Sequence, residues 1–357
     1  MKTRAVALIA ALAMLLIPAG CRGIGPIMVD QDRSNYITAI SDSWKHQMLL
    51  NLVKIRYGDA PVFLDVISVI SQYSWQGAVN LNANWFEHPY SANQGIGAGG
   101  LYTDRPTITY GPLSGEKFAR SFMRPVPPAA VMQLVQAGYR ADIVWRVLVQ
   151  TVNGISNRYG GAAQSREADP DFYRLVAKLA AIQKSGRMAV RIQEQADKSL
   201  IVIVFDLKND KELTANAAEV YRLLGIAPGT KEIKVVYGTA AASDTEIAIQ
   251  TRSILQVLID MASQIEVPEK DIVEHRVGPT FHGDPIYGPM SEPLVRIHAS
   301  AEKPADASVA VPYRGQWFWI DDKDYPSKGM FSMIMFMFSL TETGGKAEAP
   351  IVTVSTN

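Results

Sequence analysis

Apolar residues recur every three or four positions near the start of the chain, which is the spacing of one face of an α-helix. This stripe consists of Ile37, Ile40, Trp44, Met48, Leu52 and Ile55. Ser34 precedes it as a suitable N-cap, and Gly58 and Pro61 follow it as helix terminators. The pattern predicts an amphipathic helix over about residues 35–57, in which Trp44 is a large side chain of the core.

The period then shortens to two residues, which is typical of β-strands. Residues 62–73 are rich in β-branched side chains, and residues 79–85 alternate apolar residues with Asn, as expected of a strand with one face in water. These two segments predict a hairpin or a meander. Residues 86–112 are rich in turn-forming residues and predict a loop. The G-x-G-x-x-G match at residues 95–100 therefore indicates a surface loop, because the helix that a nucleotide site requires is not predicted after it.

The middle of the chain predicts short helices. One opens near Ser114, and another ends at Gly138 after a proline-rich break at residues 125–128. Residues 143–152 are apolar throughout, and we interpret them as a helix, although their pattern also fits a strand. The glycine-containing segment 157–169 predicts a loop and is a candidate boundary between two halves of the chain.

Helices and strand pairs alternate after this boundary. The expected helices lie at about 170–184, 212–224 and 252–264, and the expected strands at 187–194, 199–206, 231–237 and 245–250. This order predicts an α+β fold, with helices packed on one or more largely antiparallel sheets. We expect one large domain or two, an N-terminal α+β region over residues 33–160 and a C-terminal α+β region over residues 161–357. The order resembles the small α/β modules that assemble into rings in envelope secretion machines, a likeness of fold that does not give function.

The C-terminal part predicts three strands and one strongly apolar element. The strands lie near 294–299, 307–311 and 315–320. The apolar element runs from Met330 to Leu340, which is short of the roughly 20 residues that a membrane-spanning helix needs. We expect it to be buried on every side in the core. The aromatic residues Trp317, Phe318 and Trp319 predict strand packing in preference to a ligand platform.

The first residues of the chain have the order of a signal peptide. Basic residues precede an apolar run from Ala5 to Ile17, and small residues follow it. The residues Ile17-Pro18-Ala19-Gly20-Cys21 resemble the lipobox of bacterial lipoproteins. This resemblance implies that the signal peptide, residues 1–20, is removed and that Cys21 is acylated and becomes the new N-terminus. Two alternatives are release into the periplasm after ordinary cleavage and retention as an uncleaved anchor.

Composition and charge fit a secreted globular chain with one lipid anchor. Cys21 is the only cysteine in 357 residues, so no disulfide can form within the chain. Residues 21–32 show no periodicity and predict a lipidated tether. The 35 basic side chains equal the 35 acidic ones, and no polybasic stretch occurs, which argues against nucleic acid or anionic lipid as a partner. The membrane contact is therefore expected to come from the acyl chains on Cys21, and Arg22 resembles the residue after the cysteine in outer-membrane lipoproteins.

Candidate chemistry is sparse. His275, His282 and Asp284 lie close in sequence and are residue types that bind zinc, but their spacing matches no established motif. Asp321, Asp322 and Asp324 could supply oxygen ligands, but helix capping explains them better, with Ser327 as a suitable N-cap. The sequence predicts no cofactor, no metal site and no catalytic nucleophile.

The sequence therefore favours a lipid-anchored envelope lipoprotein of the outer membrane that faces the periplasm. It would act as a non-catalytic binding, scaffold or assembly component, with an envelope protein as a candidate partner. The alternative is a periplasmic hydrolase, with or without a metal, that uses His275, His282 and Asp284. A lipoprotein that only braces the envelope is not distinguished from the first class. If the helix stripe were exposed, its residues Ile40, Trp44 and Met48 would become a candidate partner surface.

Overall fold

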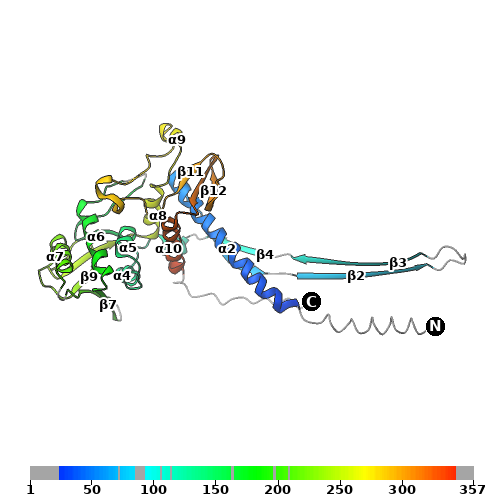
Figure 1. Cartoon of the computed structure of the whole chain (residues 1–357), viewed down its shortest axis with the longest axis horizontal. Coiled ribbons are helices and arrows are strands. Elements are labelled where there is room, and N and C mark those ends of the chain that lie inside the picture. The colour runs from blue at the N-terminus through cyan, green and yellow to red at the C-terminus, as the bar shows by residue number, and fades with distance from the viewer. Residues whose placement is uncertain are drawn as a thin grey trace.

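The computed structural model describes residues 24–70, 73–84, 93–104, 107–112, 115–161, 165–195, 198–207 and 210–342. The predicted signal peptide, the lipobox and Cys21 lie outside the described residues. In the described part, a packed body carries two long elements that leave it on the same side (Figure 1). These elements are the first helix and a two-stranded antiparallel ribbon.

The first helix, α2, runs from Ile24 to Arg56 and is longer than the sequence predicts. It begins before residue 35, so the expectation of an irregular tether up to residue 32 is wrong. Gly25 and Pro26 fall in its first turn, where backbone N–H groups have no helical partner and proline is therefore tolerated. Its 33 residues span about 50 Å. Gly58 follows the helix with a positive φ of 75°, as its place beyond the C-terminus predicts.

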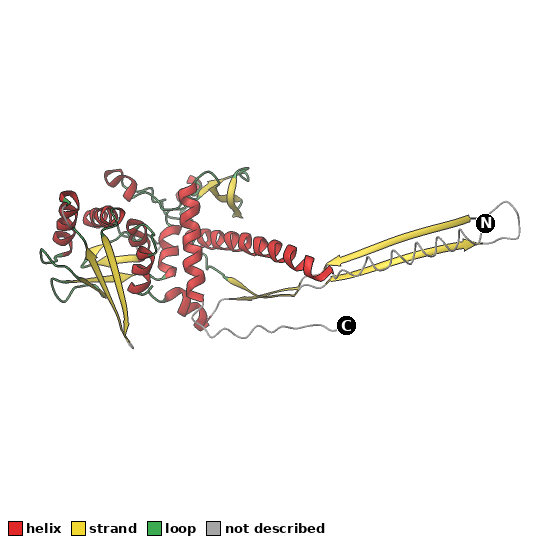
Figure 2. Cartoon of the chain, turned by 60° about the horizontal axis from the view of Figure 1, so that its bottom comes forward, coloured by secondary structure: helices red, strands yellow, loops and turns green. Residues whose placement is uncertain are grey.

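The ribbon is built from two successive strand pairs. Strand β1 (Leu64–Ile70) pairs with β4 (Thr107–Pro112), and β2 (Tyr73–Asn84) pairs with β3 (Asn93–Asp104), both antiparallel. Ile70 lies opposite Thr107 and Tyr73 lies opposite Asp104, so the register of β2 and β3, in which opposite residue numbers add up to 177, continues into β1 and β4 as far as Ser68, where it shifts by one residue. We call these four strands the ribbon. Figure 2 shows the β2–β3 part extending away from the body.

The ribbon confirms the strands predicted before residue 85, but they pair with later strands and not with each other, so the hairpin or meander predicted for them is wrong. The loop predicted at 86–112 is wrong for residues 93–104 and 107–112, which are strands. The glycine-rich residues 95–100 lie inside β3, so they form a strand and not a surface loop. Glycine weakens a strand on its own. Here every glycine of β3 has a residue of the alternating strand β2 opposite it, and this distant partner decides the conformation.

The body contains a six-stranded sheet with the order β6-β5-β10-β9-β8-β7. Its strands are β5 (Val149–Val152), β6 (Ile155–Ser156), β7 (Met188–Gln195), β8 (Lys198–Phe205), β9 (Ile233–Tyr237) and β10 (Glu246–Thr251). All neighbours in this sheet are antiparallel except β9 and β10. The associated helices are α4 (Pro128–Gln136), α5 (Ala141–Leu148), α6 (Pro170–Lys184), α7 (Lys211–Leu224) and α8 (Ile254–Ala262). The predicted α+β class, with helices on a largely antiparallel sheet, is confirmed.

Two details of the body differ from the sequence pattern. The apolar segment 143–152 is divided into the end of α5 and the strand β5, where we interpreted all of it as a helix. Strands β5 and β6 precede residue 160, and β5 pairs with β10, which follows it. Residues from both sides of the predicted boundary at 160 and 161 thus share one sheet.

A second, three-stranded sheet and the last helix complete the body. The sheet has the order β11-β13-β12, formed by β11 (His298–Ser300), β12 (Ala307–Tyr313) and β13 (Gln316–Asp321). The remaining short helices are α3 (Gly115–Phe118), η2 (Ala119–Met123), α9 (Glu269–Val273) and η3 (Pro285–Met290). As predicted, Phe318 of β13 is fully buried, and it packs in the core.

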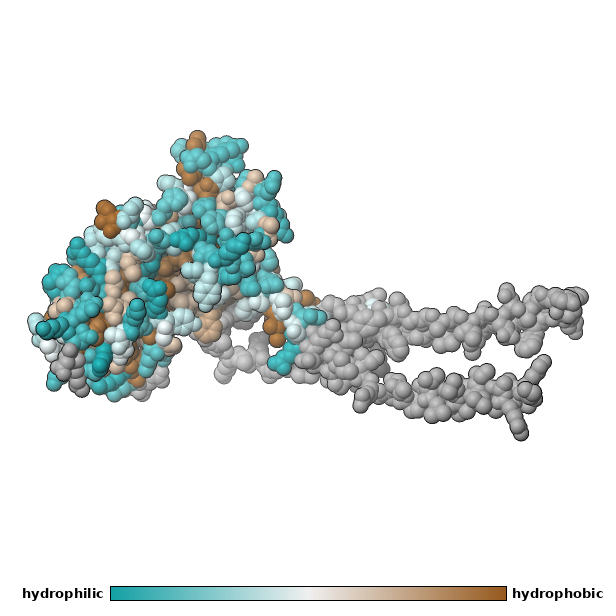
Figure 3. All heavy atoms as spheres, viewed as in Figure 1, coloured by the Kyte–Doolittle hydropathy of each residue, from teal (hydrophilic) through white to brown (hydrophobic). Residues whose placement is uncertain are grey.

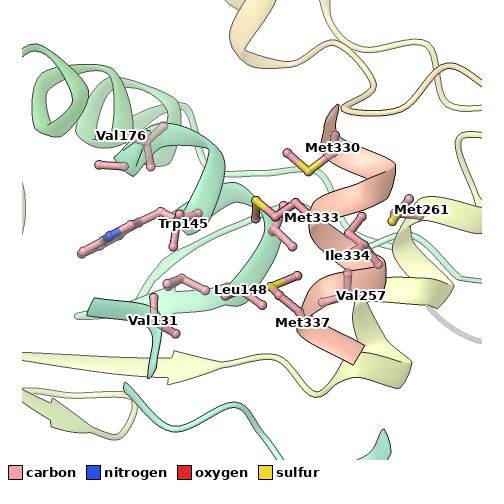
Figure 4. Packing of buried hydrophobic residues seen from close by; sticks show 14 of the residues in the cluster. Val131, Trp145, Leu148, Val176, Val257, Met261, Met330, Met333, Ile334 and Met337 are labelled. Atoms are coloured by element: carbon pink, nitrogen blue, oxygen red, sulfur yellow. The ribbon is translucent and has the colours of Figure 1, made fainter. Parts of the chain in front are cut away.

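The last helix, α10, runs from Tyr325 to Glu342 and supplies methionines to the core. Met333 and Met337 point towards Leu148 of α5, and Ile334 lies on the side of α8 (Figure 4). The expectation that this element is buried on every side is wrong. Ser332 and Phe336 lie four residues apart on one helical stripe that is exposed, with Phe336 49% exposed.

No helix in the described part of the chain is both long and apolar enough to cross a membrane.

Candidate interaction surface

The C-terminal end of α2 is fixed firmly to the body. Its residues Met48 to Val53 are mostly buried, and the helix packs against β12 and α8. Arg56 donates hydrogen bonds to the backbone oxygens of Ile265 (3.3 Å) and Gly278 (2.7 Å). These bonds hold the helix to chain segments more than 200 residues away, so the direction in which α2 leaves the body is set by its packing.

An aromatic and ionic cluster completes this attachment. Tyr57 donates a hydrogen bond to Asp271 at 2.7 Å, and its ring lies 5.5 Å from that of Tyr313. Tyr313 and Arg314 both donate to the carboxylate of Asp59, the latter at 3.0 Å. The bonds from Tyr313 and Arg314 lower the pKa of Asp59, while burial and then the bond to Asp271 raise the pKa of Tyr57 above its usual value.

This cluster predicts a loss of stability in alkali. Because the folded chain holds the Tyr57 proton at a pH where the unfolded chain has lost it, the free energy of unfolding should fall as the pH rises above about 10. The fall contributed by one tyrosine is at most about 1.4 kcal/mol per pH unit. Tyr57→Phe should make the fall shallower in urea titrations between pH 8 and pH 11.

Tyr325 provides a matched control, because its side chain is 80% exposed and Tyr325→Phe removes a hydroxyl that faces solvent. This variant should follow the wild-type curve. An equal effect of both substitutions would contradict a specific role for Tyr57.

Two amide side chains of α2 fix the beginning of the ribbon to the helix. Asn51 is buried, donates to the backbone oxygen of Val62 at 2.8 Å and accepts from its N–H at 2.9 Å. One turn earlier, Gln47 donates to the oxygen of Leu64 at 2.9 Å and accepts from its N–H. Each amide therefore pairs with the backbone as a neighbouring strand would. The helix and the ribbon are joined at a defined point.

Beyond this joint, the N-terminal part of α2 is largely in solvent. From Arg33 to Gln47 no side chain is fully buried, and Ile37 is 59% exposed. Trp44 is only partly buried, so the prediction that it is a core side chain is wrong. The apolar stripe reaches the core only from Met48 onwards, because β12 and α8 lie beside the later turns of the helix.

Apolar side chains are also exposed where the ribbon leaves the body. Val62 and Tyr110 are each 52% exposed, Leu64 is 41% exposed and Ile108 is 40% exposed. Val62 lies just before the ribbon, and the other three, together with Ile37, belong to the two elements that project on the same side of the body (Figures 1 and 2). We call residues 33–47 of α2 and the ribbon the projection, and it is the candidate interaction surface.

No protein-family model, curated protein or solved structure matches this chain. The candidate surface therefore rests on geometry alone. On the face of the body seen in Figure 3, polar residues predominate and apolar ones are scattered. The exposed large apolar side chains of the body include Tyr139, Leu200, Tyr237, Val273 and Ile286. They come from separate parts of the chain, whereas Leu64, Ile108 and Tyr110 of the projection lie on the paired strands β1 and β4.

The histidines and aspartate proposed for a hydrolase are not brought into a site. His275 and His282 are exposed, and the carboxylate of Asp284 caps η3 by accepting from the N–H of Ile286 at 2.9 Å. Among the described residues, no group of three or more His, Cys, Asp or Glu side chains is placed to hold a metal ion. The hydrolase alternative gains no geometric support.

The three late aspartates have structural partners. Asp321 accepts from the N–H of Lys323 at 2.8 Å, and Asp322 pairs with Lys328 at 2.9 Å. Asp324 accepts from the N–H of Ser327 at 3.1 Å, directly before the first residue of α10. Asp324 is thus the N-cap, and the expectation of Ser327 in that role is wrong. These contacts support the predicted capping in preference to calcium binding.

A buried ionic network is the polar cluster that sequence reasoning missed. Asp260 of α8 accepts from Arg158 at 2.6 Å and lies 3.5 Å from Arg252, whose side chain is 1% exposed. Burial lowers the pKa of Arg252 despite the nearby carboxylate. Arg158 also lies over the ring of Phe281, 3.7 Å from its centroid. The polar partners of this network are other residues of the body, so we infer that the network stabilises the fold.

Proposed function

We propose that this chain is an outer-membrane lipoprotein that faces the periplasm and acts as a non-catalytic assembly component. The lipobox-like residues 17–21 support the anchor. The observation that carries the role is the projection, in which a helix fixed at its C-terminal end and a ribbon leave the same side of a packed body. Cys21 lies three residues before the first residue of α2.

This arrangement suits a rigid strut. A lipid at Cys21 would hold the start of α2 near the membrane, and the helix of about 50 Å would set the place of the body relative to the bilayer. The apolar side chains of the projection are where a protein partner in the envelope would gain contact area. Binding through a projecting surface requires no catalytic group, which agrees with the exposed positions of His275 and His282.

The anchor is tested by metabolic labelling with a fatty-acid analogue. Wild-type protein should carry the label, whereas Cys21→Ser should lose it completely and accumulate as the longer precursor, because the thiol is the acceptor of the lipid. Absence of label from the wild type would contradict the proposal. Separation of the two membranes on a density gradient should place the labelled protein in the outer membrane, and recovery in the inner membrane would refute that location.

A further inference from the structure

The β2–β3 part of the ribbon has two open edges. Its sheet contains only these two strands, each of 12 residues, so within the described chain no strand pairs with the outer side of either. Every outward N–H and C=O along such an edge is available to another strand. A ribbon of this length therefore offers two long surfaces for main-chain pairing.

The ribbon lacks the residues that usually block an open edge. Strands β2 and β3 contain no Lys, Arg, Glu or Pro, and their only charged residue is Asp104 at the last position of β3. The body differs, since its edge strand β7 carries Arg191, which pairs with Glu232 at 2.9 Å, and its other edge strand β6 has two residues. The six-stranded sheet of the body thus has edges protected by charge and by short length, whereas the edges of β2 and β3 are open.

The register gives the ribbon two different faces. Residues of a strand alternate between faces, so opposite residues share one. The pairs at positions of the more apolar face include Trp75 with Tyr102, Val79 with Ala98 and Leu81 with Ile96. The pairs at positions of the other face include Ser74 with Thr103, Asn80 with Gly97 and Asn82 with Gly95. Two strands are too few to be stable with one apolar face, and three or more are needed.

We propose that the missing strands come from further copies of this chain, with β2 of one copy pairing with β3 of the next. Both edges have the same length, and the two strands run antiparallel within one copy. A neighbour that points the same way therefore presents its β3 antiparallel to β2. This pairing keeps all apolar faces on one side of the joined sheet. The contact is head-to-tail, and it closes into a ring when the rotation from one copy to the next divides a full turn evenly.

The choice of head-to-tail pairing rests on the proposed function. Lipids at Cys21 would attach every copy to one membrane in one orientation, so all ribbons would point the same way. Antiparallel pairing of β2 with β2 would point two ribbons in opposite directions. Parallel pairing of β2 with β2 would turn the apolar face of one ribbon to the opposite side. Of these arrangements, only pairing of β2 with β3 keeps all ribbons pointing the same way and all apolar faces on one side.

Cysteine cross-linking of the full-length lipidated chain tests this arrangement. Ser74→Cys in β2 and Thr103→Cys in β3 are conservative changes on the same face, and a short bismaleimide tolerates a stagger between neighbouring copies. Two differently tagged chains, one with each substitution, are co-expressed and treated in membranes. We expect cross-linked dimers that contain both tags, in higher yield than dimers from Ser74→Cys alone, because neighbouring β2 and β3 lie one strand spacing apart and neighbouring β2 strands lie two, about 9–10 Å. Ser243→Cys on the exposed surface of the body should give none.

Native mass measurement in mild detergent provides the second readout. Wild-type protein should be a multimer, and Asn80→Lys with Asn82→Lys should convert it to monomers without changing the unfolding of the body, because charge opposes edge pairing. A monomeric wild type, a complex with a different protein in place of a second copy, or Ser74→Cys homodimers in a yield equal to that of the mixed pair would overturn the inference. Wild-type chain has no thiol except Cys21. Its labelling by maleimide would contradict the lipid anchor separately from ribbon pairing.

Discussion

Replacing Asp260 by alanine should lower the free energy of unfolding by about 3–5 kcal/mol, because it leaves two buried arginines without their shared carboxylate. Arg158 donates to one carboxylate oxygen at 2.6 Å, and Arg252 lies 3.5 Å from the other. The N–H of Gly160 also donates to Asp260, at 2.7 Å. The amide of Gln264 donates to the same carboxylate at 3.2 Å. The substitution therefore removes a partner of four buried donors at once.

The side chain of Arg252 is almost completely buried, with 1% of it exposed. Its guanidinium donates to Gln150 at 2.9 Å and to backbone oxygens that include those of Arg146 and Arg158. These partners lie in α5, in β5 and in the segment before residue 160, while Asp260 lies in α8. The network thus connects parts on both sides of the expected boundary. Loss of the network should therefore lower the free energy of unfolding of the whole body.

Urea unfolding followed by circular dichroism measures this effect. The matched control is Asp171→Ala, which removes an aspartate paired with Arg174 at 3.1 Å on the exposed face of α6. A surface pair of this kind contributes at most about 1 kcal/mol. Equal losses for the two variants would show that Asp260 is no more than a surface charge.

Local sequence signals predicted the helices whose capping and terminating residues lie directly beside them in the sequence. Helix α7 is an example, since Asp210 accepts from the N–H of Leu213 at its start and Gly225 ends it with a φ of 66°. Helix α6 lies at the predicted residues 170–184. Here a cap, a period and a terminator agree within a short segment, so nothing distant is needed to decide the structure.

Contacts between distant residues explain what the sequence did not predict. The glycine-rich strand β3 forms because β2 lies opposite it, and no short window contains both strands. The buried network of Asp260 joins residues about 100 positions apart. The residues next to an arginine in the sequence do not indicate whether its side chain is buried or exposed. The length of α2 that is exposed also depends on where the packing of β12 and α8 against this helix ends. A helical period gives the face of a helix but not the length over which that face is covered.

Trp44 and Trp145 show most clearly that apolar spacing predicts the apolar face of a helix but not how deeply a side chain on that face is buried. Both lie in segments with apolar spacing, but Trp44 is only partly buried and Trp145 is 2% exposed. Trp145 lies on the side of the core where Val131 of α4 and Val176 of α6 are found (Figure 4). Its indole is among the largest fully buried side chains of the described residues. The energetic role that the stripe predicted for Trp44 therefore belongs to Trp145.

Trp145→Ala should lower the free energy of unfolding by about 3–5 kcal/mol, the cost of removing a buried large aromatic side chain and leaving a cavity. Trp44→Ala should cost no more than about 1 kcal/mol, because the helix around it faces solvent and surface substitutions have small effects. Urea midpoints of both variants, measured on the same protein preparation, give the comparison. A loss at Trp44 as large as that at Trp145 would mean that a second copy or another partner covers the projection in solution, since no other described element buries this side chain fully.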